Sequence, residues 1–348
     1  MKKKSLGGLL LAAVLLVALV GVLLFFTGRL YQDYRGRAFS HQFEMCISED
    51  MTPQTVIDSI FATGYARDKA SLRRSFARIG SDKEMKPGHY TFDTRSSAIY
   101  VARMLKKGWQ TPVNLTLSGT IRTRGGLARK IGNQIELDSS EVAEALLSQE
   151  FLQKFGMDST NLFAYIIPDT YQVYWTASLE DVFSKFKKGY DAFWTRERDR
   201  KAEDLGLTRL QVSTLASIVD GETHYQPEQP AIAGVYLNRL RKGMKLQADP
   251  TVAYCYGYTL TRILTAHLSV DSPYNTYRYA GLPPGPISCP PQGCLDAVLN
   301  AEKHDYLYFC ANSSLNGSHV FAVTYPEHLV NAKAFQRALS DRLRAQGK

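Results

Sequence analysis

An uncharged segment near the start of the chain places the strongest limit on how it can fold. Residues 5–27 are 23 positions rich in Leu and Val that contain no charged side chain. A membrane span needs about 20 apolar residues, whereas a signal-peptide core has about 7–15 and is followed by a small-residue cleavage site. The next residues, Gly28-Arg29-Leu30-Tyr31, contain no Ala-x-Ala pattern. We therefore expect an uncleaved single transmembrane helix within residues 1–30, with residues 5–27 in the plasma membrane.

The charges beside this segment predict its orientation. Lys2, Lys3 and Lys4 precede it, and positive residues stay on the cytoplasmic side of a membrane. Arginines on the other side, the first at Arg29, weaken this bias without reversing it. We expect the N-terminus to be cytoplasmic and residues from about 30 onward to lie outside the membrane.

The rest of the chain is long enough for two domains, because about 320 residues exceed the usual size of one. The net charge of +9 includes the three N-terminal lysines. A basic exterior suits an anionic partner such as a cell wall, a membrane surface or a nucleic acid, or serves solubility alone. No segment interleaves aromatic residues with Lys and Arg as nucleic-acid modules do, so we expect no nucleic-acid partner.

The cysteine pattern indicates neither a metal site nor a defined disulfide. There are five cysteines, so at least one thiol is unpaired, and they are Cys46, Cys255, Cys289, Cys294 and Cys310. Cys289 and Cys294 are close enough in sequence to pair, but the sequence does not show whether they do. Together with Cys310 and His304 they could form a zinc set, yet their spacing is not that of a common zinc module. We expect no metal and no cofactor.

Local patterns predict an α+β protein with two parts beyond the anchor. Residues 39–112 should form a small α/β unit, with a strand at 39–47, helices starting at Thr52 and Asp68, a strand after Pro87-Gly88 and a helix at 99–107. Residues 113–348 should form a larger mixed α+β domain. Its expected elements are a strand at 113–117, helices at 122–131, 139–155, 179–205, 229–242, 295–303 and 329–345, and a hairpin of 306–311 with 318–322.

One further helix carries the most informative residue, Glu222. Thr208 can cap this helix, and Gln211 completes a capping box. Leu215, Ile218 and Val219 stand seven, four and three residues before Glu222, so all four project from one side. A carboxyl group held against a core has a raised pKa, as a general acid at neutral pH requires. Asp220 lies about 200° around the helix, so we expect it to point elsewhere and to be solvated.

Several motifs follow one another in a specific order. They are Ala216-Ser217-Ile218-Val219-x-x-Glu222-Thr223, Asn238-Arg239-Leu240, Gly243-Met244-x-Leu246-Gln247-x-Asp249-Pro250-Thr251-Val252, Tyr274-Asn275-Thr276-Tyr277, Gly281-Leu282-Pro283-Pro284-Gly285-Pro286-Ile287 and Tyr306-Leu307-Tyr308-Phe309. In these motifs the chain resembles the YceG-like endolytic murein transglycosylase family (MltG), and the resemblance covers nearly all of the chain. Pro168-Asp169-Thr170-Tyr171 matches the family's Pro-Asp-Thr-Tyr turn.

The resemblance implies a bacterial inner-membrane lyase with an extracytoplasmic catalytic domain at 113–348. Residues 39–112 would be the family's LysM-like membrane-proximal domain. The enzyme would cut bonds between N-acetylmuramic acid and N-acetylglucosamine within nascent peptidoglycan glycan strands. Its products would end in 1,6-anhydro-N-acetylmuramic acid, and the cut would terminate strand elongation. An association with penicillin-binding wall synthases is also implied.

The family's catalytic glutamate corresponds to Glu222, and the chain departs from the family pattern at nearby positions. The usual acidic neighbour is Asp220, and Gly221 replaces the usual Lys between the two. Phe163-Ala164 replaces a Glu-Gly pair, and Cys294 replaces the Ser that opens a helix. None of these changes removes a residue to which we assign chemistry.

A lytic transglycosylase can work with one carboxyl group. Glu222 would protonate the glycosidic oxygen and then take the proton from the sugar's own 6-hydroxyl, which attacks C1. Positioning this internal nucleophile replaces a second carboxylate. The expected substrate contacts are Gln247, Asn275, Tyr277, Asn238 and Arg239.

Each of these contacts except Tyr277 has a structural alternative. Asn275 could stabilise a turn, Gln247 could simply face solvent, and Asn238 and Arg239 could serve a helix end. Asp249, before Pro250, could start a turn or act as a second acid.

Two other functions compete with the transglycosylase. A water-using muramidase would need Asp249 as its second carboxylate, because glycoside hydrolases usually employ two, and it would leave reducing ends. A non-catalytic adaptor would bind glycan and recruit wall synthases through residues 39–112. Replacing Glu222 would leave the adaptor's function intact.

Overall fold

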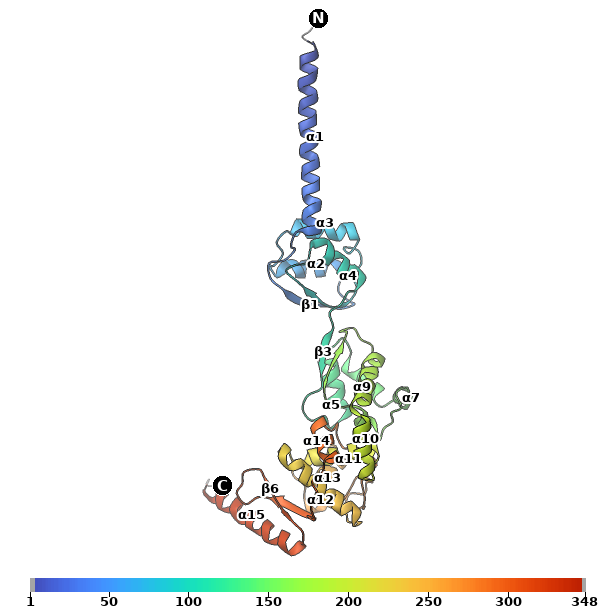
Figure 1. Cartoon of the computed structure of the whole chain (residues 1–348), viewed down its shortest axis with the longest axis vertical. Helices are drawn as coiled ribbons and strands as arrows, with labels where there is room; N and C mark the ends of the chain where they lie inside the picture. Colours follow the sequence, from blue (N-terminus) through green and yellow to red (C-terminus); the bar gives the residue numbers. More distant parts are fainter. Residues whose placement is uncertain (1–3, 346–348) are drawn as a thin grey trace. The chain divides into compact units, whose positions relative to one another are not determined.

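The computed structural model describes residues 4–345. Its internal contacts separate two compact units (Figure 1). The first comprises the chain up to Val113 together with Gln172–Ala177, and the second comprises Asn114–Tyr171 and the chain from Ser178 onward. This division falls next to the expected boundary at 112–113, except that the short segment Gln172–Ala177 returns to the first unit. The protein is of the mixed α+β class.

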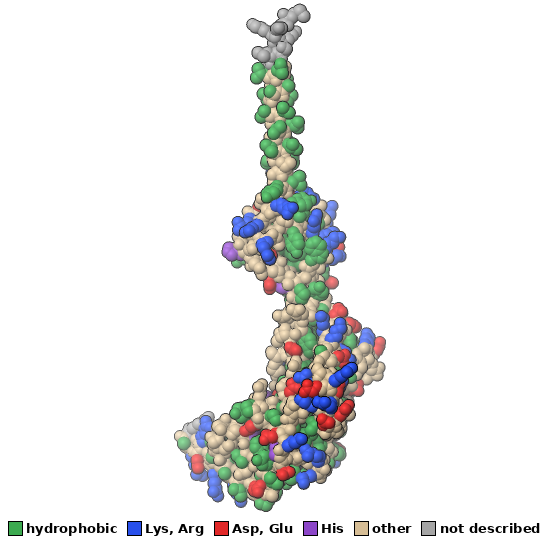
Figure 2. Space-filling view, viewed as in Figure 1, with side chains coloured by type: hydrophobic (Ala, Val, Ile, Leu, Met, Phe, Trp, Pro, Cys, Tyr) green, Lys and Arg blue, Asp and Glu red, His purple; other side chains and the backbone are tan. Residues whose placement is uncertain are grey.

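The first unit begins with one long helix, α1 (Lys4–Arg35). Its segment Gly7–Arg35 is long and apolar enough to cross a membrane, and its apolar side chains are exposed along the helix (Figure 2). The helix continues beyond the expected end at residue 27, because its last turns pack against α3 and α4. There Asp33 is fully buried and bonded to Ser71 and Arg74 of α3. Lys2 and Lys3 lie outside the described residues.

The rest of the first unit is a small α/β domain. Its elements are β1 (Phe43–Ile47), α2 (Pro53–Ala62), α3 (Lys69–Ile79), β2 (Gly88–Phe92) and α4 (Ala98–Lys107). The two strands pair antiparallel, with Phe43 opposite Phe92, and the helices close over an apolar core. The expected caps Thr52 and Asp68 each accept a hydrogen bond from a helix N–H. The expected strand start at residue 39 was wrong, because Phe39 bridges to Ala66 instead of pairing with β2.

The remaining chain is mainly helical. Its elements are β3 (Val113–Thr116), α5 (Arg124–Gly132), α6 (Ser139–Ala145), α7 (Gln149–Gln153), α8 (Leu162–Tyr165), β4 (Thr170–Val173), α9 (Leu179–Phe193), α10 (Arg196–Asp204), α11 (Arg209–Glu222), η1 (Gln226–Glu228), α12 (Gln229–Arg241), α13 (Asp249–Cys255), η2 (Thr265–Ser269), α14 (Gln292–Leu299), β5 (Tyr308–Ala311), β6 (His319–Ala322) and α15 (Tyr325–Ala345). β3 lies beside β4, and β5 pairs antiparallel with β6.

Two expected helices are each divided in two by an internal cap. Ser148 accepts a hydrogen bond from the N–H of Phe151 and starts α7. Thr195 does the same for Arg198 and starts α10. A Ser or Thr hydroxyl offers the backbone an alternative to continuing the helix, so the expected single helices at 139–155 and 179–205 were wrong.

Helix α11 forms the centre of the second unit, where it contacts α12, α13 and α14. Leu215, Ile218 and Val219 are fully buried, as expected. The other sides of the helix are buried too, and Ser217 bonds to backbone groups of Thr214 and Ile287 there. The helix is therefore enclosed by protein on several sides and does not have one apolar face.

Candidate active site

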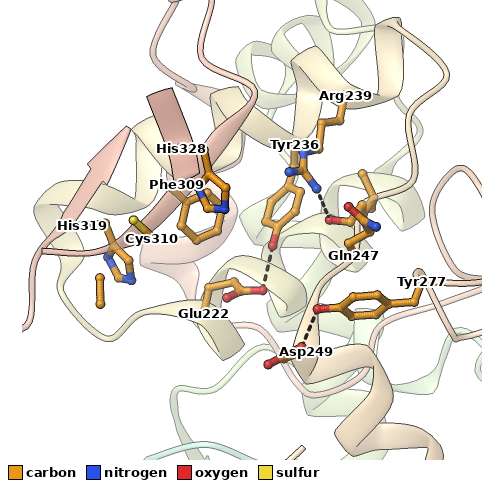
Figure 3. Close-up of a pocket in the computed structure, with 12 residues that line it drawn as sticks. Glu222, Tyr236, Arg239, Gln247, Asp249, Tyr277, Phe309, Cys310, His319 and His328 are labelled. Carbon is orange, nitrogen blue, oxygen red and sulfur yellow. Dashed lines mark hydrogen bonds between the residues drawn. The ribbon is translucent and has the colours of Figure 1, made fainter. Parts of the chain in front are cut away.

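The carboxyl group of Glu222 stands at the C-terminal end of α11 and faces a pocket (Figure 3). The expected capping box of Thr208 and Gln211 is formed at the other end of the helix. The phenol of Tyr236, on the following helix α12, donates a hydrogen bond of 2.7 Å to Oε1 of Glu222. The α11–α12 pair thus brings together two side chains that are 14 residues apart in sequence.

The surroundings of Glu222 bring the pKa of its carboxyl group close to neutral pH. Burial is the largest influence and raises the pKa of Glu222 to about 7. The hydrogen bond from Tyr236 lowers this pKa, the negative charge of Asp249 raises it, and the positive charge of Arg239 lowers it. Since a general acid works best when its pKa lies near the working pH, Glu222 can both give and take a proton at neutral pH.

A second carboxylate, Asp249, lies beside Glu222 and opens helix α13. The phenol of Tyr277 donates a hydrogen bond of 2.6 Å to its Oδ1 (Figure 3). Burial and the bonded carboxylate together raise the pKa of Tyr277, which keeps the phenol protonated as a donor. Asp249 is exposed and is followed by Pro250 in the first turn of the helix, so it starts a helix where the sequence suggested a turn.

A glycine allows the two carboxylate-bearing helices to approach each other. A Cβ atom on Gly221 would lie 2.6 Å from Cβ of Pro250, which is closer than two carbon atoms can pack. The end of α11 and the start of α13 therefore meet at a position that only glycine can occupy without a shift of the backbone.

Glu222 and Asp249 border two pockets at once. The Tyr236 pocket has a volume of about 380 Å³ and is lined by Glu222, Tyr236, Arg239, Leu246, Gln247, Asp249, Tyr277, Phe309, Cys310, Ala311, His319 and His328. The Asp220 pocket has a volume of about 280 Å³ and is lined by Thr120, Arg122, Ser217, Asp220, Gly221, Glu222, Asp249, Pro250, Ala253, Tyr258, Leu260, Ile263, Ile287 and Ser288. A chain-like ligand that occupied both pockets would pass Glu222.

Three of the expected contact residues, Gln247, Tyr277 and Arg239, line the Tyr236 pocket beside Glu222. Gln247 is exposed and has a backbone φ of 52°, a conformation that is rare for residues other than glycine. Its backbone N–H is bonded to the carbonyl of Thr276, which holds the residue in this conformation. Such local strain is common at functional sites.

Arg239 and Asn238 are both buried on α12 and bond to backbone carbonyls. Arg239 donates to Leu307 and Leu246 and also lines the Tyr236 pocket. Asn238 donates to His304 and Tyr306 and is not among the residues lining either pocket. These contacts connect α12 to the segment that leads into β5 and, through Arg239, to Leu246. Both residues therefore have structural contacts, although these are not contacts with a helix end.

Asn275 is fully buried and lies away from both pockets. Its amide nitrogen donates to the carbonyls of Leu268 and Val270, and its amide oxygen accepts from the N–H of Tyr277. Both ends of the side chain are thus occupied by the backbone. This geometry matches the turn-forming alternative, in which Asn275 positions Tyr277.

The expectation that Asp220 is solvated was wrong. Asp220 is only 5% exposed, and burial raises its pKa. Its Oδ1 accepts a weak 3.7 Å contact from the thiol of Cys294, while its Oδ2 has no hydrogen-bond partner within the described residues. The side chain does point away from the Tyr236 pocket, but what it meets there is helix α14 and the Asp220 pocket. A buried oxygen without a partner beside a pocket is available to a ligand.

Sequence reasoning missed two residues of the site. Tyr236 was not singled out within the expected helix at 229–242, although a buried phenol needs a hydrogen-bond partner and so could have been recognised. His328 of α15 lines the Tyr236 pocket, and its buried Nδ1 has no partner in the described part of the chain. Nothing in the sequence around His328 indicates that α15 reaches the site.

Two further histidines have hydrogen bonds to protein groups. His319 bonds to Glu228, and His304 bonds to the backbone of Ala231 and Tyr306. Cys289 and Cys294 are buried free thiols. Within residues 4–345 no group of three potential metal ligands lies close together.

Comparison with known proteins identifies a family model and several relatives that match this chain. The model of the YceG-like family matches residues 45–334. The chain is 39% identical over 166 residues to an endolytic murein transglycosylase of Bacillus subtilis (strain 168), covering 47% of this chain and 45% of that protein. It is 26% identical over 273 residues to one of Streptococcus pneumoniae (strain D39), covering 68% and 48%. The chain therefore spans about half the length of the curated relatives it matches.

A solved structure resembles the fold over most of the chain. It is the crystal structure of a putative YceG-like protein from Listeria monocytogenes, with 26% identity and a TM-score of 0.54. The match covers 83% of this chain and 98% of that one. Since the family model spans most of the sequence and includes the helix pair that carries Glu222 and Tyr236, the chain belongs to the YceG-like family.

Proposed function

We propose that this protein is an endolytic murein transglycosylase that uses Glu222 as its single general acid and base. The observation that carries this proposal is a carboxyl group with a pKa of about 7 between two pockets. The names of the bacterial relatives supply the substrate class, peptidoglycan glycan strands.

The two steps of the reaction need one proton carrier. Glu222 first gives its proton to the oxygen of the bond between N-acetylmuramic acid and N-acetylglucosamine, and this bond breaks. The 6-hydroxyl of the same muramic acid residue then attacks C1, and Glu222 accepts the hydroxyl proton. The product is a 1,6-anhydro end, and no water is consumed. Holding the hydroxyl near C1 gives it a high effective concentration, so the reaction does not need a second carboxylate.

Tyr236 supports both protonation states of Glu222. Its pKa is raised far above the ordinary value, mainly by burial, so the phenol remains a donor throughout the cycle. A hydrogen bond from a neutral donor stabilises the carboxylate left after the first step without fixing it permanently in the charged form, as a cation would.

The position of Glu222 supports cleavage within strands. Pockets on both sides of the carboxyl group allow sugar units to extend in both directions from the broken bond. We propose Gln247 and Tyr277 as substrate contacts in the Tyr236 pocket, with Arg239 shaping its wall. Asn275 would position Tyr277 through its backbone N–H, and Asn238 would hold the segment before β5 in place.

We further propose that α1 anchors the protein in the bacterial inner membrane, with the N-terminus cytoplasmic. The lysines before the apolar segment support this orientation. The first unit would be a LysM-like membrane-proximal domain, and its strand–helix–helix–strand order is consistent with this. Cleavage at the membrane would terminate nascent strands beside their penicillin-binding synthases.

Mass spectrometry of digested peptidoglycan tests the proposal. The full chain in detergent is compared with Glu222→Gln, which keeps the shape but cannot transfer the proton. We expect internal fragments with anhydro ends from the wild type, and a rate at least about 100-fold lower in the variant.

Other outcomes of that experiment point to the competing functions. Reducing ends would instead identify a muramidase, and loss of activity in Asp249→Asn would then be expected. Retained glycan binding without cleavage by either protein would support the adaptor.

A further inference from the structure

A third pocket of the second unit lies next to the Asp220 pocket and shares Arg122 and Tyr258 with it. This Arg122 pocket has a volume of about 320 Å³, and no acidic residue lines it. Its walls combine the cations Arg122 and Arg124 with aromatic and apolar groups such as Phe163 and Tyr254. Because Arg122 borders both pockets, a ligand held here would be continuous with one that reaches Glu222.

The two arginines have unused hydrogen-bonding capacity. Arg122 is exposed, and its guanidinium group lies 5.2 Å from the ring centre of Tyr258. Arg124 donates one hydrogen bond to the carbonyl of Ser159. Neither has an ion-pair partner among the carboxylates of residues 4–345. A guanidinium group carries five N–H donors, so most of those at this pocket are available to a ligand.

The local backbone adds to the positive potential. Helix α5 begins at Arg124, with Thr123 as its cap. The first turn of a helix carries a partial positive charge. Two arginines and a helix start at one pocket without a carboxylate therefore select an anionic group.

We propose that the Arg122 pocket binds a carboxylate of the peptide that murein carries on its muramic acid residues. This inference rests on the proposed function. In a peptide-bearing strand the lactyl carboxyl group of each muramic acid is bound to the peptide as an uncharged amide, so the anionic groups near a cleaved bond are the carboxylates of these peptides. The apolar walls suit the rest of a peptide, and Arg is the residue that best matches a carboxylate with two parallel hydrogen bonds. The pocket thus selects peptide-bearing strands over bare ones.

The test compares cleavage of soluble, uncross-linked strands that carry their peptides with strands from which an amidase has removed them and in which the freed lactyl carboxylates have been converted to uncharged methyl amides. The full chain in detergent is used, and kcat/KM is measured for both substrates. We expect the wild type to prefer peptide-bearing strands by about tenfold, the effect of one hydrogen-bonded charge. In the double variant Arg122→Gln, Arg124→Gln this ratio should fall to about one. Arg129→Gln, an exposed change on the same helix but outside the pocket, should keep the wild-type ratio.

The outcomes separate this inference from the proposed function. A wild-type ratio near one, or a preference that survives in the double variant, overturns the peptide site while anhydro ends still establish the transglycosylase. If neither substrate is cut, the proposed function fails, and binding decides the inference: the free acidic peptide is titrated against Glu222→Gln and against the same variant lacking both arginines. Weaker binding without the arginines supports the site, and equal binding overturns it. Stronger binding of inorganic phosphate than of the peptide also overturns it, in favour of a phosphate site.

Discussion

The two units of this protein each hold a carboxyl group, fully buried in the first and half-buried in the second, and they hold it in opposite ways. In the first unit, Asp33 is fully buried and bonded to Arg74 and Ser71, with Arg78 nearby. In the second, Glu222 accepts its hydrogen bond from a neutral phenol and has another carboxylate, Asp249, beside it. Both groups lie where a helix ends and meets a second helix.

The difference shows how a fold separates a structural acid from a reactive one. Cations hold Asp33 in its charged form, and its bonds fasten α1 to α3. Glu222 has no such fixed partner, so both of its protonation states remain accessible. A carboxyl group shielded from water is therefore a candidate catalyst when its partners are neutral or negative. When its partners are positive, it is a candidate structural residue that joins two elements through an ion pair.

The largest expected effect tests the structural half of this comparison. Asp33→Ala should destabilise the first unit by about 3 kcal/mol, the lower end of the range for removing one member of a buried pair, because Arg74 can still reach water. Hydrogen exchange of amides in α3 and α4 measures this unit separately. Asp93→Ala, whose partner Arg95 is 85% exposed, is the control and should destabilise the unit far less, because an exposed ion pair contributes little. Equal losses in the two variants would contradict the fastening role.

The matching substitution in the second unit, Glu222→Gln, should increase stability at high pH, whereas Asp33→Ala decreases it. The pKa of Glu222 is raised from 4.5 to about 7, so the folded state binds more protons and loses stability as the pH rises between these values. Glu222→Gln removes this loss. At pH 8 the variant should be more stable than the wild type by at most about 3 kcal/mol, at about 1.4 kcal/mol per pH unit, and near pH 4 the two should be equal. Hydrogen exchange of α11 amides at both pH values is the measurement, and a destabilised variant at pH 8 would contradict the assignment.

A smaller effect concerns the phenol. Tyr236→Phe removes the hydrogen bond that lowers the pKa of Glu222. The acid must be protonated for the first step, so activity falls as the pH rises through this pKa. In the variant that fall should move to higher pH, as the profile of kcat/KM against pH would show. Tyr190→Phe, which changes a buried tyrosine away from both pockets, is the control. An unmoved profile in Tyr236→Phe would remove the phenol from the mechanism.

The smallest effect concerns the neighbouring carboxylate. Asp249→Asn removes a negative charge that raises the pKa of Glu222, so the same fall should move to lower pH, opposite to the phenol variant. The charge acts through space and ranks below the hydrogen bond among the influences on Glu222, so the displacement should be the smaller of the two. Complete loss of activity at every pH would instead make Asp249 a second catalytic group.

The sequence predicted the elements of this fold better than their interruptions. Helix starts such as Thr52 and Thr208 follow from side-chain chemistry within a few residues, and they were correct. Ser148 and Thr195 have the same chemistry inside otherwise helical patterns. A single Ser or Thr there is compatible with either outcome, and the packing of the two resulting helices decides between them.

The same limit applies to the site. The position of Glu222 on its helix was predicted from periodicity, whereas the burial of Asp220 was not. Periodicity describes how one helix packs against one core, but α11 has neighbours on several sides. One of them is α14, whose Cys294 lies 74 residues after Asp220 in the sequence. His328 is more distant still in sequence. Which groups share a pocket depends on such long-range contacts, and no local pattern contains them.

Gly221 has a consequence for how this site can change over evolutionary time. The contact between α11 and α13 leaves no room for a methyl group opposite Pro250, whereas the family resemblance places a lysine at the corresponding position. A lineage that acquired this lysine would first have to lose the close contact, and one that lost Pro250 would gain the freedom to replace the glycine. The two positions should therefore show epistasis: a substitution at either one is neutral or harmful depending on the residue at the other.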